Sequence, residues 1–237
     1  MDWSLFAIGA TGWGDELLRG FGLTVLLGLT AAATGTALGL LAALCELARF
    51  RAAAWLVAAG NLVLRSLPEL LVIFLMYYGA AFALQALLSP LGVDGLIEVS
   101  AFWAAVIALA LIHAAYASQV FRGALTSIPA GQVEAAHSLG MTRSKTFLRI
   151  KLPIAVRLAL PGLTNLLLTT LKNTPFVSAI GLQDLIRAAG DAGQNTKYYF
   201  QFYMASLVVY LVIAGGALAF QVYYEGRVFR HLRRVPA

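Results

Sequence analysis

Charged residues and cysteine are both scarce in this chain. Only 12% of its 237 residues are Asp, Glu, Lys or Arg, and 60% are hydrophobic, whereas soluble globular chains are about a quarter charged. Several apolar runs are long enough to cross the roughly 30 Å hydrocarbon core of a bilayer as helices. The single cysteine, Cys45, excludes an intrachain disulfide. We therefore expect an all-α polytopic membrane protein, with residues 1–237 forming one transmembrane domain.

The sequence also lacks the motifs of common catalytic and nucleotide-binding sites. It has no His-Glu-x-x-His, no cysteine cluster, no Gly-x-Ser-x-Gly and no glycine-rich loop ending in Lys-Ser/Thr. We therefore expect no catalysis by this chain and no cofactor or metal bound to it. The expected activity is passive or coupled movement of a solute across a membrane. The net charge of +6 comes from short loops beside apolar runs, which indicates membrane orientation and no nucleic-acid partner.

Five apolar segments are predicted to span the membrane. The second contains Pro68, which removes a backbone donor and disfavours helix at Leu67. Because a split there would leave a first piece too short to cross, we expect one long kinked span. The polar residues 183–198 are predicted to form an external loop with an exposed pair of Asp184 and Arg187. The spans cover residues 20–47, 53–88, 100–126, 153–182 and 199–226.

Basic residues predict how the chain is oriented. If the C-terminal tail, the loop at 127–152 and the turn at 49–51 share one side, that side holds about twelve Lys and Arg, and the other holds about three. The positive-inside rule then makes the 127–152 loop and the C-terminus cytoplasmic and the N-terminus external. Glu46 is expected to pair with Arg49 near the headgroups.

The polar stretch from Pro129 to Gly140 is predicted to form a short helix outside the membrane. Proline is suited to a helix start and glycine to a helix end. Between them, Glu134 stands beside the small residues Ala135 and Ala136. Such a helix could fit into a groove of another protein. The helix macrodipole alone would also favour an acid at Glu134, so this residue has two interpretations.

Polar residues inside the spans are candidates for a substrate pathway, because ionisable groups at membrane depth are costly. Arg65 and Glu69 flank Pro68 and could form an ion pair on one helix face, or Glu69 could meet a cationic substrate. A second group surrounds Pro175, where a broken helix could line a site or its polar side chains could join helices. The candidate pathway residues are Arg65, Glu69, Asn165, Lys172, Asn173, Thr174 and Ser178.

Three motifs together resemble one family. Glu134-Ala135-Ala136, Gly140, Ile150 and Leu152-Pro153 match the spacing of the "EAA" loop of ATP-binding-cassette importer permeases. The run from Arg65 to Leu71 resembles the Arg-Gly-Thr-Pro-Leu-Leu signature of polar amino acid permeases. The run from Leu171 to Pro175, with Ser178, Ile180 and Gly181, resembles their Leu-Lys-x-Thr-Ser segment. The chain is most similar to the Q-type permeases of histidine/lysine/arginine/ornithine and opine importers, in which an acid follows the signature proline.

The resemblance implies a five-helix type I importer permease in a bacterial inner membrane, with its N-terminus periplasmic. It implies pairing with a homologous permease or a second copy, and a periplasmic substrate-binding protein as donor. Two ATPase subunits would bind ATP and Mg²⁺ and dock on the coupling helix through Glu134, Ala135, Ala136 and Gly140. The substrate would be a polar, basic amino acid or an opine.

The sequence departs from the family pattern at three places. Ser66-Leu67 replaces Gly-Thr, and Pro175 replaces the usual serine. Asn173 stands where several basic-amino-acid permeases have an acid, which leaves Glu69 as the main candidate for contact with a cationic side chain.

Two other classes of function fit the sequence less well. A stand-alone secondary transporter or channel for a small polar solute would need no docking helix and is typically built from repeats, which are not evident here. A membrane-embedded enzyme would need a catalytic constellation, which the sequence lacks.

Overall fold

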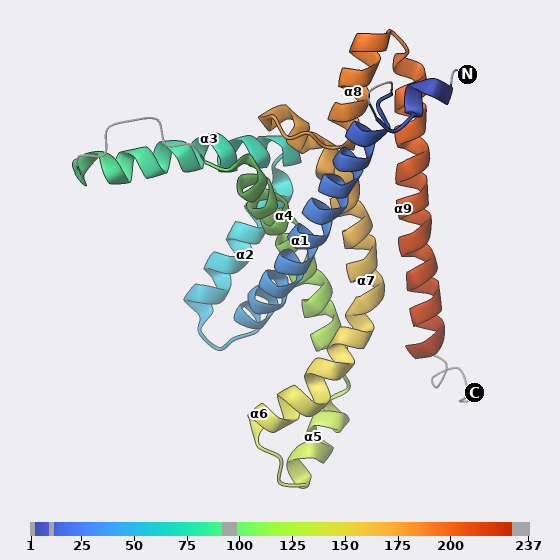
Figure 1. The fold of residues 1–237 in the computed structure, drawn as a ribbon. Helices are drawn as coiled ribbons and strands as arrows, with labels where there is room; N and C mark the ends of the chain where they lie inside the picture. Colours follow the sequence, from blue (N-terminus) through green and yellow to red (C-terminus); the bar gives the residue numbers. More distant parts are fainter. Residues whose placement is uncertain (1–2, 10–11, 92–98, 229–237) are drawn as a thin grey trace.

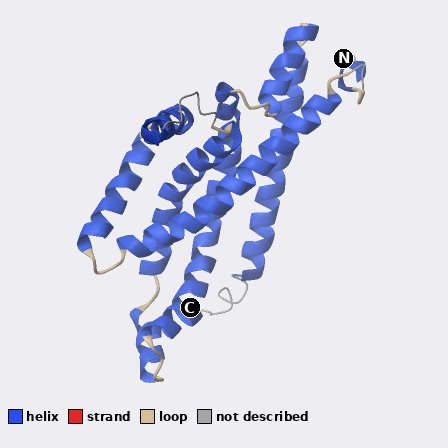
Figure 2. Cartoon of the chain, turned by 60° about the vertical axis from the view of Figure 1, so that its left-hand side comes forward, coloured by secondary structure: helices blue, strands red, loops and turns tan. Residues whose placement is uncertain are grey.

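The computed structural model describes residues 3–9, 12–91 and 99–228, and helices dominate these residues (Figures 1 and 2). Within these ranges, five helical segments are long and apolar enough to cross a membrane, as predicted, and the all-α fold class is confirmed. The α-helices are α1 (Gly14–Glu46), α2 (Arg51–Ser66), α3 (Glu69–Leu88), α4 (Ala101–Thr126), α5 (Ala130–Ser138), α6 (Arg143–Thr146), α7 (Leu152–Asn173), α8 (Leu185–Thr196) and α9 (Tyr199–Val228).

The centre of the bundle is formed by α1, α4 and α7. Small residues bring α1 and α4 together: a Cβ added at Gly39 would lie only 2.6 Å from the Cβ of Ala117. Helices in lipid associate through such close backbone approach, because no water drives them together. The buried ring of His113 adds a polar link, with Thr36 Oγ1 at 3.0 Å from Nε2 and Thr170 Oγ1 at 2.8 Å from Nδ1.

The expected second span over 53–88 is two helices and not one kinked helix. Leu67 adopts an extended conformation, with φ −87° and ψ 145°, and α3 begins directly after Pro68. Proline both lacks the N–H that a continuous helix needs and disfavours helix at the preceding residue. As a result α3 points away from the bundle, across the direction of α7 and α9 (Figure 1).

The predicted loop over 183–198 contains a helix, α8, which lies at the opposite end of the molecule from α5 (Figure 1). The side chain of Asp184 caps α8 by accepting the N–H of Arg187 at 2.9 Å, and it is only 1% exposed. The expected exposed pair of Asp184 and Arg187 is therefore wrong. Arg187 instead pairs with Asp191, one turn further on, at 3.5 Å.

Asp184 gives this end of the molecule an expected pH dependence. It lies between two membrane-spanning segments, and burial raises the pKa of its carboxyl to about 6, although backbone N–H groups oppose the shift. Its Oδ2 is buried without a partner. Between about pH 4 and 6 only the folded state holds the proton, so folding is favoured at acidic pH. As the pH rises through this window, stability should fall by on the order of 2–3 kcal/mol.

The measurement is the melting temperature of the purified chain at pH 5 and pH 7.5. Asp184→Asn keeps a good N-cap without the titrating group, so its melting temperature should depend less on pH than that of the wild type. An unchanged pH dependence in this variant would show that Asp184 is not the responsible group.

Candidate functional site

The predicted coupling helix is present as α5 and ends in a glycine cap. It runs from Ala130 to Ser138, and Gly140 has a φ of +75°. The N–H of Met141 donates to Ala136 O at 3.1 Å, and the N–H of Gly140 donates to His137 O at 2.9 Å. This is the hydrogen-bond pattern of a Schellman motif. A Cβ at Gly140 would meet no atom within 4 Å, so the backbone conformation and not lack of space requires glycine here.

The α5–α6 segment protrudes from one end of the bundle (Figures 1 and 2). Ala136 is buried against the chain itself, whereas Glu134 and Ala135 are exposed. Leu139, at the end of α5, is 83% exposed. The outward surface thus combines an acid, a small residue and a large apolar residue. The sequence motif did not single out Leu139, because its exposure depends on how α5 packs.

A π-helix joins this protruding segment to α7. It covers Phe147–Lys151, and the N–H of Leu152 donates to Phe147 O, five residues earlier. Pro153 follows at the start of α7 and has no N–H to donate. The wider π turn therefore lies where the regular helical hydrogen bonds are interrupted, next to the Leu152-Pro153 pair of the motif.

The break at Pro68 brings two candidate pathway residues together. The side chains of Glu69 on α3 and Asn173 on α7 lie close enough to interact. The alternative pairing of Glu69 with Arg65 is not found in the part of the chain that the structure describes. Arg65 instead donates from Nε to the backbone oxygen of Asn61 at 3.1 Å. Glu69 is therefore placed at the junction of α3 with α7.

The polar residues of α7 do not all have the same surroundings. Asn165, Thr169 and Lys172 are exposed and, spaced four and three residues apart, share one helix face. Thr174 is buried, donates to Leu171 O at 2.8 Å and lies 3.4 Å from the hydroxyl of Tyr210. The polar side chain of Thr174 is therefore explained by its contacts within this segment and with α9.

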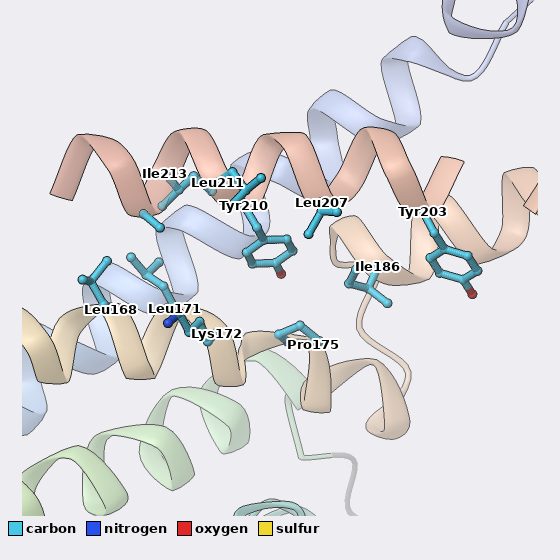
Figure 3. Close-up of a pocket in the computed structure, with 11 residues that line it drawn as sticks. Leu168, Leu171, Lys172, Pro175, Ile186, Tyr203, Leu207, Tyr210, Leu211 and Ile213 are labelled. Carbon is cyan, nitrogen blue, oxygen red and sulfur yellow. The ribbon is translucent and has the colours of Figure 1, made fainter. Parts of the chain in front are cut away.

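Two further candidates complete the group. Ser178 is half-buried and donates to Pro175 O at 2.8 Å. Lys172 also borders a cavity of about 450 Å³ between α7 and α9, whose lining is otherwise apolar or tyrosine (Figure 3). No acidic side chain among the described residues forms an ion pair with Lys172.

Comparison with known proteins gives consistent matches. The family described as "Binding-protein-dependent transport system inner membrane component" matches residues 35–230. Nopaline transport system permease protein NocQ of Agrobacterium fabrum is 38% identical over 215 residues, covering 90% of this chain and 91% of that protein. Arginine ABC transporter permease protein ArtQ of Escherichia coli K12 is 38% identical over 204 residues, covering 81% of this chain and 86% of that protein. A solved amino acid ABC transporter with histidines has a TM-score of 0.77 at 29% identity, covering 91% of this chain and 95% of that chain.

The fold and the protruding helix define a multi-pass ABC-importer permease. The chain belongs to the family of binding-protein-dependent transport system inner membrane components. The resemblance found in its motifs is thereby confirmed, and the inner membrane is its location. Members of this class work with ATPase subunits and a substrate-binding protein.

Proposed function

We propose that this chain is the permease subunit of an ATP-driven importer for basic amino acids or opines. The observation that carries the substrate class is Glu69, an acid beside Asn173 at the helix break after Pro68. A carboxylate at such a position can accept hydrogen bonds from a guanidinium or ammonium group. Relatives named for nopaline and arginine support the same class, because both compounds carry a guanidinium group.

The exposed surface of α5 supports docking of separate ATPase subunits. Ala135 allows close approach, Leu139 offers an apolar anchor and Glu134 a charge at the edge. ATP and Mg²⁺ would be bound and used by those subunits, since this sequence lacks a phosphate-binding loop. ATP binding can move the permease only by favouring one of its conformations. In the proposed mechanism α5 is the element through which that preference reaches the spans.

The exposed polar face of α7 supports pairing with a second permease, either homologous or a second copy. Asn165, Thr169 and Lys172 lie within a membrane-spanning segment. Ionisable side chains at membrane depth face a protein interior or a water-filled cavity. A second permease beside α7 would enclose such a pathway. With α5 in the cytoplasm, the α8 end would be periplasmic and would receive the binding protein.

A competition experiment tests the substrate class. Vesicles containing this chain, its ATPase and its binding protein would take up labelled arginine in the presence of excess lysine, nopaline, glutamate or leucine. We expect inhibition by compounds with a cationic side chain and little inhibition by glutamate or leucine. Equal inhibition by all of them would contradict the proposed selectivity.

A further inference from the structure

A buried carboxylate joins three helices toward the end of the bundle that carries α5. Glu46, the last residue of α1, accepts a hydrogen bond from Asn61 Nδ2 at 2.8 Å and forms an ion pair with Arg122 Nη1 at 3.1 Å. Asn61 Nδ2 also donates to Ser118 Oγ at 3.0 Å. The expected pairing of Glu46 with Arg49 is therefore wrong, and the acid turns inward toward α2 and α4.

This network is well shielded. The side chain of Glu46 is only 6% exposed, whereas that of Arg122 is 48% exposed. Both carboxylate oxygens of Glu46 are paired, one with Asn61 and one with Arg122. Satisfied polar networks in a low-dielectric environment fix one arrangement of their members, and loss of one partner leaves the others unpaired at high cost.

The position of α2 depends on this network more than the positions of α1 and α4 do. Asn61 is the only buried residue of α2, at 8% exposed, and Trp55 and Leu62 on the same helix are 71% and 59% exposed. By contrast, α1 and α4 are held together over much of their length by close contacts at Gly35 and Gly39. The polar contacts of Asn61 thus supply the most buried attachment of α2 to the bundle, beside the packing of half-buried Leu64 against the apolar core.

The network also lies between the two parts of the candidate site. Arg122 is one helical turn before the end of α4, and α4 leads directly to α5. On the other side, Arg65 Nε donates to the backbone oxygen of Asn61. Arg65 is in the last turn of α2, immediately before the break at Pro68 and Glu69. A chain of contacts therefore links Arg122, near the end of α4 that leads to α5, with Arg65, beside the helix break at Pro68.

We propose that Glu46 is a positioning residue for coupled transport, which makes α2 move together with α4 when the ATPase displaces α5. Through α2, this movement would reach the break where Glu69 lies. The inference rests on the proposed function. A position between two sites is not in itself evidence of coupling, so the test must measure coupling and not stability.

The test compares Glu46→Gln with wild type in the purified complex of this chain and its ATPase. Basal ATP hydrolysis should persist, and its stimulation by substrate-loaded binding protein should fall by about tenfold. Arg49→Gln is the matched control, because it removes a charge from an exposed position close to Glu46 and should leave both basal and stimulated hydrolysis unchanged.

The native Cys45 provides a readout that needs no substrate. It is half-buried beside Glu46, and its maleimide labelling rate should change on ATP binding in wild type but not in Glu46→Gln. Unaltered stimulation in Glu46→Gln, a parallel loss of basal and stimulated hydrolysis, or a retained ATP response of Cys45 would each overturn the inference. A wild-type complex that is not stimulated by any basic amino acid would refute the proposed substrate instead, and the Cys45 labelling would still decide the role of Glu46.

Discussion

Replacing Glu69 by glutamine should reduce the uptake of arginine and lysine by about 10- to 100-fold and that of a neutral amino acid far less. The two side chains are nearly isosteric, so α3 and the contact with Asn173 should remain in place while the negative charge is lost. A hydrogen bond to a charged group contributes about 1.5–3 kcal/mol, and 1.4 kcal/mol corresponds to a factor of ten.

The measurement is the initial uptake rate of each amino acid in the same vesicle preparation. Arg49→Gln is a suitable control, because it removes one charge from an exposed position outside the membrane-spanning segments. Equal losses for arginine and for a neutral amino acid would remove Glu69 from substrate recognition and leave it a structural role at the junction of α3 and α7.

Replacing Gly140 by valine should lower coupled transport about tenfold or more while leaving the membrane-spanning part folded. With φ at +75°, Gly140 occupies a conformation that costs an L-residue roughly 1–2 kcal/mol, and a β-branched residue is especially unsuited to it. Loss of the cap would displace Leu139 and loosen the last turn of α5. We expect weaker binding of the ATPase, measured by titrating it against the permease in vesicles.

Gly123 allows a matched comparison with Gly140. A Cβ would find open space at both positions, but only Gly140 has a positive φ. Gly140→Ala should therefore impair ATPase binding, whereas Gly123→Ala, within α4, should be neutral or slightly stabilising. Equal tolerance of the two would show that the cap does not control docking. Glu134→Lys adds an independent test, since it changes the charge of the docking surface without changing the backbone.

Local sequence signals were sufficient for the parts of the fold that depend on near neighbours. Pro129 and Gly140 mark the ends of α5, because an N-terminal proline and a left-handed glycine act within a few residues. Likewise, the length of each apolar run indicates how many segments can span a membrane. The motif around Glu134 also predicts the short helix that the structure shows as α5.

Features that depend on distant partners could not be predicted in this way. The partner of Glu46 is Arg122, far along the chain, although Arg49 is closer in sequence. The sequence predicts an exposed Asp184, whereas in the structure α8 packs against α1 and α9 and Asp184 is buried. This packing joins residues that are far apart in the chain, so a local pattern does not reveal it. The sequence around Asp184 does contain a signal for an N-cap, since an aspartate before a helical pattern is a common start signal.

The central claim, that α5 links the permease to a separate ATPase, is tested most directly by uptake with each component withheld. Vesicles would contain this chain and its second permease, with ATPase, internal ATP and external binding protein added or omitted in turn. We predict that labelled arginine accumulates against its gradient only when all components are present, and that Glu134→Lys in the complete system abolishes accumulation. Saturable arginine uptake without ATP or the ATPase would contradict this account and indicate a stand-alone transporter or channel.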